Sequence, residues 1–375
     1  MSGDAAVGLA TPVTPAWRRG RARSVHFLAA AALAFIATAW LTRHDGGVDS
    51  GPQTPTPTVL VSGISGLGNN LFQVAAAVYY AETYGFQVAL DASSPILRWG
   101  TAGFTNRDKV RRSLRGAKLS YLDTLFRSPK LKQQWPVGNG TDALAGLTGL
   151  PGVTTVHNDY AVARYVPRQE ARPGTSGLPS PNLHLTGFHQ HRDLFLPTLA
   201  RLPAYLNLDV DWATRALLYA RYGLSPGKQR HAIMLGVRRG ADFAHMTKVG
   251  LASYERGLRA VFETRAGHAT PWTLVVLADT DVADMQLADR ASALAAEYGP
   301  HSVRTVFISE DDITQLHAGL ACDHFILSES TFHYWIAVLR GVLPPRRPAV
   351  QVVVFEGTDL TNRPLALEGW TRLPY

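Results

Sequence analysis

The sequence predicts an α/β protein built on parallel sheets of the doubly wound type. Two observations carry this prediction. Residues 59–91 contain a strand pattern, a glycine-rich turn, an apolar helix pattern and a second strand pattern, which is the unit that opens such a sheet. From residue 232 to residue 355, short β-branched runs again alternate with amphipathic stretches.

In the first half, VLVSGIS (59–65) is a β-branched run that predicts a strand. LFQVAAAVYYAETY (71–84) repeats apolar residues with helical spacing and predicts a helix. FQVALD (86–91) predicts the second strand. Residues 92–180 follow no such pattern; they contain a basic segment and one N-glycosylation sequon, at Asn139.

The second half predicts further strands and helices in alternation. The expected strands cover 232–237, 273–278, 303–309, 324–328 and 350–355, and the expected helices cover 254–265, 282–299 and 330–341. Between the two halves, residues 200–230 are sparse in pattern and contain an SPGKQ turn. We therefore expect two domains, 59–225 and 226–375.

The first 58 residues predict a membrane-anchored front end. VHFLAAAALAFIATAWL (25–41) carries no charge, and with one flanking residue at each end its helix would be roughly 28 Å long, enough for a thin bilayer. Arginines on its N-terminal side favour a cytosolic tail (1–23), a transmembrane signal-anchor (24–42) and a Pro/Thr/Gly-rich stem (43–58). A cleaved signal peptide is the alternative, because the run contains small residues.

Composition narrows the class of protein. The chain has 375 residues, of which 46% are hydrophobic and 18% charged, so it is an ordered globular protein. Its net charge is +8, but five of the 37 basic residues and one of the 29 acidic residues lie in 1–43, which leaves +4 for the rest. That mild excess suits a small anionic ligand, and we expect no nucleic-acid partner. The single cysteine, Cys322, excludes a disulfide framework and a cysteine-rich metal site.

SGISGLGNN (62–70) is a glycine loop between the first strand and the first helix. Glycines let backbone N–H groups approach a ligand, and a helix N-terminus favours anions. With Asp91 at the end of the next strand, the arrangement imitates a dinucleotide fingerprint, but Leu71 stands where the third glycine belongs. A nicotinamide-dependent oxidoreductase, or a tight turn without a ligand, is the alternative.

LGVRRGADF (235–243) places Arg238 and Arg239 where a strand ends. Successive strand residues point to opposite faces, so we expect one arginine on a ligand and the other supporting a loop or paired with an acid. A guanidinium keeps its charge and binds a diphosphate bidentately. A pair of surface arginines is the alternative.

Three more polar stretches follow strands or precede helices. In SESTF (328–332), Ser328, Ser330 and Thr331 either cap a helix or give hydroxyls to a phosphate at its positive end. In ADTD (278–281), Asp279 and Asp281 suit capping of the next helix, with a contact to a base or ribose, better than a metal site.

The third stretch, FHQHRDLF (188–195), concentrates His189, His191 and Asp193 around Gln190. No HExxH pattern supports a metal there. It is either a loop that positions an acceptor substrate or a set of surface histidines.

Taken in order, these stretches resemble glycosyltransferase family 11, the α-1,2-fucosyltransferases. The family opens with GGLGNQ-F-Q before a helix, and SGLGNNLFQ is similar. Its G-[YF]-x-Q segment resembles GFHQHRDLF, its HxRRGDY resembles GVRRGADF, and VVLADTD resembles its strand that ends in acids. SESTFHYWIAVL is similar to the family's SNS-[ST]-F-x-W and aromatic-rich helix, and matches recur from about residue 60 to 341.

The resemblance implies a GT-B-like fold, in which two Rossmann-like domains face a cleft, with an N-terminal acceptor-side domain and a C-terminal GDP-sugar-binding domain. It implies an inverting transfer of L-fucose from GDP-β-L-fucose to a glycan hydroxyl, with galactose O-2 as the expected position, and no metal or other cofactor. A short tail, one membrane span and a stem are also how Golgi members of such families are built. We therefore expect a single-pass type II Golgi membrane protein with its catalytic part in the lumen.

The resemblance also implies roles for individual residues. By position, Arg238 matches the arginine on the donor diphosphate, with Arg239 in support. Further donor-side contacts are implied for Gly66, Gly68, Asn69, Asp279, Ser328, Ser330 and Thr331, and acceptor-side contacts for His189 and Gln190. The acceptor proton is expected on Asp242, His189 or water.

Three positions depart from the family pattern. Gly236 stands where the family has histidine, Ala241 is inserted before Asp242, and Asn70 replaces glutamine. A catalytically silent glycan- or GDP-binding protein on the same scaffold is therefore a second alternative.

Overall fold

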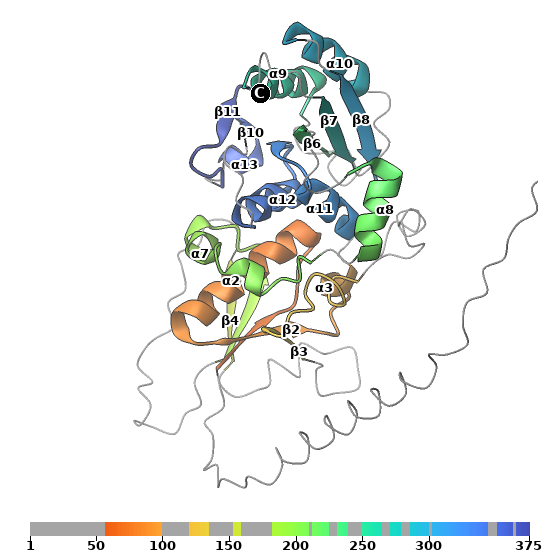
Figure 1. Cartoon of the computed structure of the whole chain (residues 1–375). Coiled ribbons are helices and arrows are strands. Elements are labelled where there is room, and N and C mark those ends of the chain that lie inside the picture. Colours follow the sequence, from red (N-terminus) through yellow and green to blue (C-terminus); the bar gives the residue numbers. More distant parts are fainter. Residues whose placement is uncertain are drawn as a thin grey trace, which may run out of the picture. The chain divides into compact units, whose positions relative to one another are not determined.

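The computed structural model describes residues 57–99, 120–134, 153–158, 182–209, 212–224, 231–238, 249–264, 271–278, 286–299, 302–343, 351–362 and 365–375. All of them belong to one compact unit, residues 55–375. They form two sheets whose paired strands all run parallel (Figure 1), which confirms the prediction of an α/β protein with parallel sheets.

The first sheet has the strand order β3-β2-β1-β5-β4. Its strands are β1 (Thr58–Val61), β2 (Gln87–Asp91), β3 (Leu131–Gln134), β4 (Val153–Asn158) and β5 (Asn182–Gly187). After β1 the chain builds outward through β2 and β3 on one side, whereas β4 and β5 lie on the other side. The strand order therefore reverses between β1 and β5, which makes their carboxyl ends a topological switch point.

The second sheet has the order β11-β10-β9-β6-β7-β8. Its strands are β6 (His231–Val237), β7 (Trp272–Ala278), β8 (Val303–Ile308), β9 (His324–Ile326), β10 (Val352–Phe355) and β11 (Thr371–Leu373). The chain runs outward from β6 to β8 on one side and from β9 to β11 on the other. This sheet has its switch point between β6 and β9.

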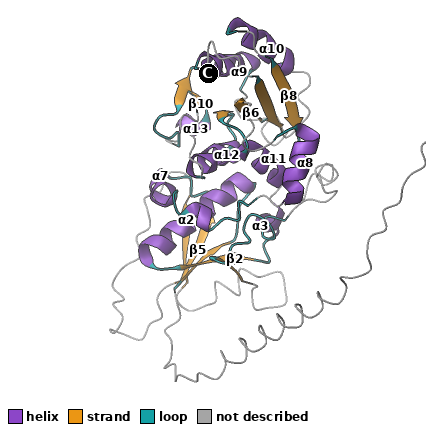
Figure 2. Ribbon diagram, in the orientation of Figure 1, coloured by secondary structure: helices purple, strands orange, loops and turns teal. Residues whose placement is uncertain are grey.

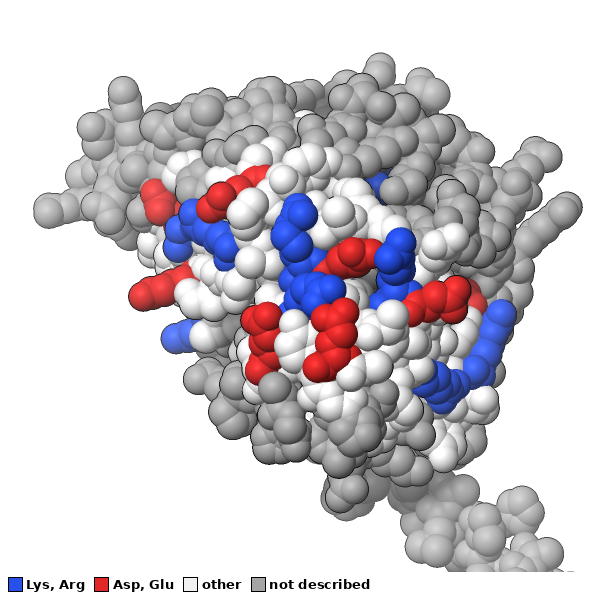
Figure 3. Space-filling view, turned by 90° about the horizontal axis from the view of Figure 1, so that it is seen from above, with Lys and Arg blue, Asp and Glu red and all other residues white. Residues whose placement is uncertain are grey.

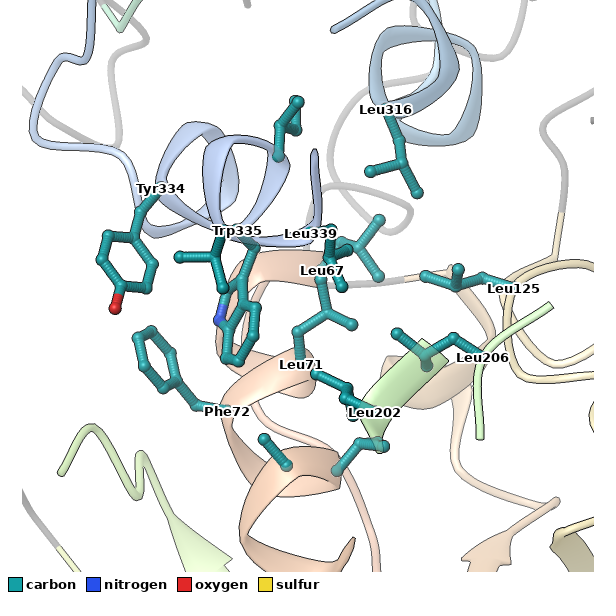
Figure 4. Close-up of a cluster of buried hydrophobic side chains, with 14 of the residues drawn as sticks. Leu67, Leu71, Phe72, Leu125, Leu202, Leu206, Leu316, Tyr334, Trp335 and Leu339 are labelled. Atoms are coloured by element: carbon teal, nitrogen blue, oxygen red, sulfur yellow. The ribbon is translucent and has the colours of Figure 1, made fainter. Parts of the chain in front are cut away.

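Two helices join the sheets into one hydrophobic core. Helix α2 (Leu67–Tyr84) follows β1, and helix α12 (Thr331–Val342) follows β9; the two helices pack together (Figures 1 and 4). The ring of Phe72 on α2 lies 4.9 Å from that of Trp335 and 5.6 Å from that of Tyr334, both on α12. All three rings are fully buried, so the contact between α2 and α12 is aromatic and dry.

Helices α9 (Leu251–Glu263) and α10 (Leu287–Glu297) lie by the second sheet (Figure 2). A second apolar cluster lies between these helices and that sheet. Ion pairs connect these helices on their outer side: Arg259 pairs with Glu297, and Arg290 lies 3.4 Å from Glu255. Seen from above, basic and acidic side chains are interspersed there (Figure 3). Because these two pairs are largely exposed, each adds little to stability.

The remaining described helical segments have between 3 and 11 residues. They are α3 (Pro95–Trp99), α7 (Arg192–Phe195), α8 (Trp212–Tyr222), α11 (Asp312–Leu320), α13 (Asp359–Asn362) and the 3-10 turns Leu196–Thr198 and Leu202–Ala204.

The first strand and helix differ in their bounds from the sequence prediction. Strand β1 ends at Val61 rather than at residue 65, because Gly63 and Ser65 have φ values of 82° and 58°, which turn the chain out of the sheet. Helix α2 begins at Leu67, four residues before its expected start. The glycine loop is thus shorter and tighter than its sequence suggests.

Several elements were not predicted from the sequence. Strand β5 carries His184 and Thr186, which hide its apolar pattern although the strand is mostly buried. Helix α8 lies within the stretch expected to be a domain boundary. Helix α11 had an available signal, since Asp311 caps it through hydrogen bonds of 3.1 and 3.0 Å from the amides of Ile313 and Thr314.

The expected tail, membrane span and stem lie before residue 57, outside the described residues. Within the part of the chain that is described, no helix combines the length and the apolarity needed to cross a bilayer. The domain boundary expected between residues 225 and 226 also falls in a segment that is not described, so its position stays a prediction.

Candidate functional site

The switch point of the first sheet collects the predicted residues of the N-terminal half. The glycine loop, with Gly66, Gly68 and Asn69, follows β1, and His189 and Gln190 follow β5. Since β1 and β5 are neighbouring parallel strands, both segments leave the same edge of the sheet side by side. In open α/β sheets this is where ligands bind.

Two buried amides on α2 hold these segments in place. Gln73 accepts a 3.0 Å hydrogen bond from the Gly63 amide and donates a 2.7 Å bond to the Gly187 carbonyl, which ties the ends of β1 and β5 together. Asn70 accepts a 2.7 Å bond from the amide of Ile64. Because both side chains are almost fully buried, these bonds fix the loop before any ligand arrives.

The backbone at this switch point is strained. Ser65, two residues before the start of α2, has a φ of 58°, and His189, two residues after the end of β5, has a φ of 49°. Residues other than glycine rarely adopt this left-handed backbone region, and those that do concentrate at functional sites. The two strained residues therefore support the placement of a site at the β1/β5 edge.

The switch point of the second sheet collects the predicted residues of the C-terminal half. In the register of β6 and β9, Leu235 stands beside Ile326. Arg238 follows Leu235 by three residues, and Ser328 follows Ile326 by two residues. Arg238, which is half-buried, and Ser328, which is buried, therefore follow adjacent strands at the same edge of the sheet. The expectation that these two groups share a site is thus consistent with the strand register.

Asn69 connects the two switch points. Its Oδ1 atom accepts a 2.9 Å hydrogen bond from Gln190 Nε2 and a 3.1 Å bond from Thr331 Oγ1. These three residues come from three of the predicted stretches, 121 and 262 residues apart from Asn69 along the chain. In this arrangement the Thr331 hydroxyl hydrogen is committed to Asn69, whereas the expected role of Thr331 was to donate to a phosphate.

Gly68 allows this approach. A Cβ atom at this position would lie 2.4 Å from the Phe332 backbone nitrogen and 2.5 Å from the Thr331 carbonyl carbon. The missing side chain thus makes room for the first turn of α12. A Cβ at Gly66, in contrast, would meet open space, which leaves that face of the loop free for a ligand.

The N-termini of α2 and α12 therefore meet at the site, and neither is capped by a side chain. Gly66 and Ser330 occupy the N-cap positions without a side-chain hydrogen bond, and neither helix has an acidic residue in its first turn. Each N-terminus carries roughly half a positive charge. Two such ends in contact favour an anion near them, and the capping role that the sequence suggested for Ser330 is not seen.

The structure adds one residue to the site that the sequence patterns did not single out, His333. His333 Nδ1 lies 3.0 Å from Ser328 Oγ, and its ring packs over Gly236. The sequence offered only a weak signal, a histidine three residues after a potential N-cap, because contact with Gly236 depends on strand order.

Four residues of the predicted site fall outside the described residues: Arg239, Asp242, Asp279 and the glycosylation position Asn139. Their roles stay predictions. Among the described residues, no group of three or more His, Cys, Asp or Glu side chains has an arrangement that would hold a metal ion.

Asp91, the acid of the dinucleotide alternative, is engaged locally. Its Oδ1 accepts hydrogen bonds from the backbone N and the hydroxyl of Ser93, at 2.9 and 2.6 Å, which closes the turn after β2. Asp91 is also buried. An acid that closes its own turn is poorly placed to hold a ribose, so the structure disfavours this alternative.

Behind the loop, His184 lies 2.8 Å from the Ser62 hydroxyl through its Nε2 atom. Burial lowers the pKa of His184 below its ordinary value, and the charge of Asp91 offsets part of that shift. His184 is therefore neutral near pH 7 and supports the end of β1 through a neutral hydrogen bond.

No known protein-family profile and no curated protein matches the chain. Among solved structures, an Arabidopsis thaliana FUT1 mutant in complex with GDP is 12% identical, with a TM-score of 0.48 over 84% of this chain and 73% of that chain. The fucosyltransferase NodZ from Bradyrhizobium is 14% identical, with a TM-score of 0.41 over 76% and 94%. The E. coli ADP-heptose LPS heptosyltransferase II is 13% identical, with a TM-score of 0.38 over 84% and 92%.

These similarities are too distant to assign a family.

Proposed function

We propose that the protein is an inverting fucosyltransferase that moves L-fucose from GDP-β-L-fucose to a glycan hydroxyl, with galactose O-2 as the proposed position. One observation carries the proposal. The switch points of both sheets are joined through Asn69, which bonds Gln190 and Thr331, where two uncapped helix N-termini meet. An anionic nucleotide diphosphate suits that place.

The chemistry needs a site that stabilises negative charge. As the bond between the fucose anomeric carbon and the β-phosphate oxygen breaks, the electron pair stays with GDP. The acceptor hydroxyl attacks the opposite face of the anomeric carbon, and its proton leaves to Asp242, His189 or water. Fixed N–H donors at the helix ends and the guanidinium of Arg238 would stabilise the departing diphosphate, and this electrostatic term is the main catalytic contribution that we propose.

We further propose that His189 and Gln190 face the acceptor. They follow β5 and lie beside the glycine loop, and Gln190 donates to the same Asn69 oxygen that contacts α12. A polar pair beside the donor loop is suited to orient a sugar hydroxyl.

The test is GDP release measured across several GDP-sugars and acceptors. We expect release with GDP-fucose and a terminal galactoside, and a loss of 100-fold or more, on the order of one lost charge-stabilising donor, in Arg238→Ala. Arg259→Ala, on the outer face of α9, is the matched control and should stay within about twofold. Near-normal release by Arg238→Ala would contradict the assignment.

The GDP-release assay and a cofactor titration together separate the alternatives. A catalytically silent binding protein would bind GDP yet release none from any GDP-sugar. An oxidoreductase would bind NAD(P), which a fluorescence titration detects.

We also propose a Golgi location with residues 24–42 as the membrane anchor. Recovery of the full chain in a soluble fraction would contradict this location.

A further inference from the structure

His333 occupies an enclosed position at the β6/β9 switch point. It lies in the first turn of α12, and only 3% of the residue is exposed. A Cβ atom built on Gly236 would come within 2.4 Å of its Nδ1 atom and 2.6 Å of its Cγ atom. The ring therefore fills the space that exists because residue 236 has no side chain.

Gly236 is held from its carbonyl as well. Tyr254, on α9, donates a 3.0 Å hydrogen bond to the Gly236 carbonyl oxygen. Helix α9 packs with the apolar cluster on one face of the second sheet, whereas α12 belongs to the core shared with α2. The ring of His333 and the hydroxyl of Tyr254 thus fix Gly236 near the end of β6. Arg238 lies two residues after Gly236.

The ring also reaches Ser328. The separation of 3.0 Å between His333 Nδ1 and Ser328 Oγ is a hydrogen-bond distance, and both groups are buried. Ser328 precedes the N-cap residue, Ser330, so its hydroxyl is not needed to cap the helix. One histidine therefore contacts both strands of the switch point, β6 through Gly236 and the segment after β9 through Ser328.

We propose that His333 is a positioning residue that orients the Ser328 hydroxyl toward the diphosphate of the donor; this inference rests on the proposed function. A serine hydroxyl has one hydrogen to donate. When Nδ1 carries the imidazole hydrogen, it donates to Ser328 Oγ, and the serine hydrogen is left to donate to a phosphate oxygen. We call these two consecutive hydrogen bonds, from His333 to Ser328 and from Ser328 to the phosphate, the relay. No covalent bond is made or broken in it, and no proton is transferred.

The relay explains why position 236 is glycine in this chain. Any side chain there would displace the ring and break its contact with Ser328.

The experiment measures GDP affinity by calorimetry in four variants, together with the donor KM, kcat and melting temperature. His333→Leu removes the donor, His333→Asn keeps an N–H near the Nδ1 position, and Ser328→Ala removes the hydroxyl. We expect His333→Leu and Ser328→Ala each to weaken GDP binding by about 10- to 100-fold, as for loss of a hydrogen bond to a charged group. The double variant should be no weaker than either single variant, and His333→Asn should stay within a few-fold of the original chain.

His324→Leu is the matched control. His324 is a buried histidine at the amino end of β9, at the opposite end of the strand from Ser328. We expect it to change stability but not GDP affinity. If His333→Leu does not fold, Ser328→Ala and His333→Asn still test the relay. The relay is overturned if Ser328→Ala binds GDP as tightly as the original chain does. It is also overturned if His333→Asn loses as much GDP affinity as Ser328→Ala.

The outcomes separate this inference from the proposed function. If the original chain binds no GDP, both the relay and the proposed function are wrong. If it binds GDP and releases it from GDP-fucose while His333→Leu binds equally well, only the relay falls. Additive effects of the two single variants would also overturn it, since independent groups add and a relay does not.

Discussion

Gly68 gives the sharpest test of the joint between α2 and α12. In Gly68→Ala, the new Cβ would lie 2.4 Å from the Phe332 nitrogen, about 1 Å short of the ordinary contact distance of 3.4 Å. The atoms that it meets belong to the backbone of α12, so no side-chain rotation relieves the overlap. The two helices must separate by about that distance, which would stretch the 3.1 Å hydrogen bond between Asn69 and Thr331 beyond its working range.

The expected cost follows from three contributions. Overpacking of a tight contact costs about 1–3 kcal/mol. The lost hydrogen bond adds about 1 kcal/mol. Alanine is the better helix former by up to about 1 kcal/mol in a helix interior, and by less in the first turn, which offsets part of this. We therefore expect Gly68→Ala to lower the free energy of unfolding by about 2–3 kcal/mol, or the melting temperature by roughly 3–5 °C.

Gly66→Ala is the matched control in the same loop. Its Cβ would meet open space, and its φ of −82° suits alanine, so stability should stay within about 0.5 kcal/mol. If the donor lies against this face, Gly66→Ala should instead weaken GDP binding. Scanning calorimetry and a GDP titration of both variants check the two patterns. Equal stability of Gly68→Ala and Gly66→Ala would refute the helix-contact reasoning.

Two further predictions concern pH and the shared core. Burial holds the folded-state pKa of His184 below 6.5, so protonation favours the unfolded chain, and the stability present above that pH is lost as the pH falls toward the folded-state value. His184→Gln should lose less melting temperature between about pH 7 and pH 5 than the original chain, and an unchanged slope would contradict this origin. Phe72→Ala should cost about 3–5 kcal/mol in urea unfolding because it empties the aromatic contact between α2 and α12, whereas Phe307→Ala, at a side chain 43% exposed, should cost less than about 1 kcal/mol. Similar losses in the two variants would show that this contact contributes little to stability.

The candidate site was partly accessible to sequence reasoning because its parts are local. A glycine loop between a strand and a helix, an arginine at a strand end and a hydroxyl-rich helix start each follow from short patterns. Buried supports such as Gln73 and Asn70 were not accessible in this way, since an amide in a helix pattern does not indicate which distant backbone groups it bonds.

Gly68 shows the same limit from the other side. Its sequence context suggested a glycine that lets a ligand approach. The structure shows that its missing side chain makes room for the first turn of α12. The hydrogen bond beside it joins Asn69 to Thr331, which lies 262 residues further along the chain. A glycine pattern reports that space is needed and not what fills it.

By itself, the sequence determined the class of fold, the order of seven strands and of the four helices α2, α9, α10 and α12, and the segments that end at the carboxyl edges of the sheets, because hydrophobic periodicity and turn chemistry act between near neighbours. Only the tertiary structure decided which of these edges are adjacent, that Asn69 joins both, and that His333 fills the space above Gly236. These contacts depend on strand order and on the packing of α2 against α12, and both are set by the burial of apolar surface across the whole chain.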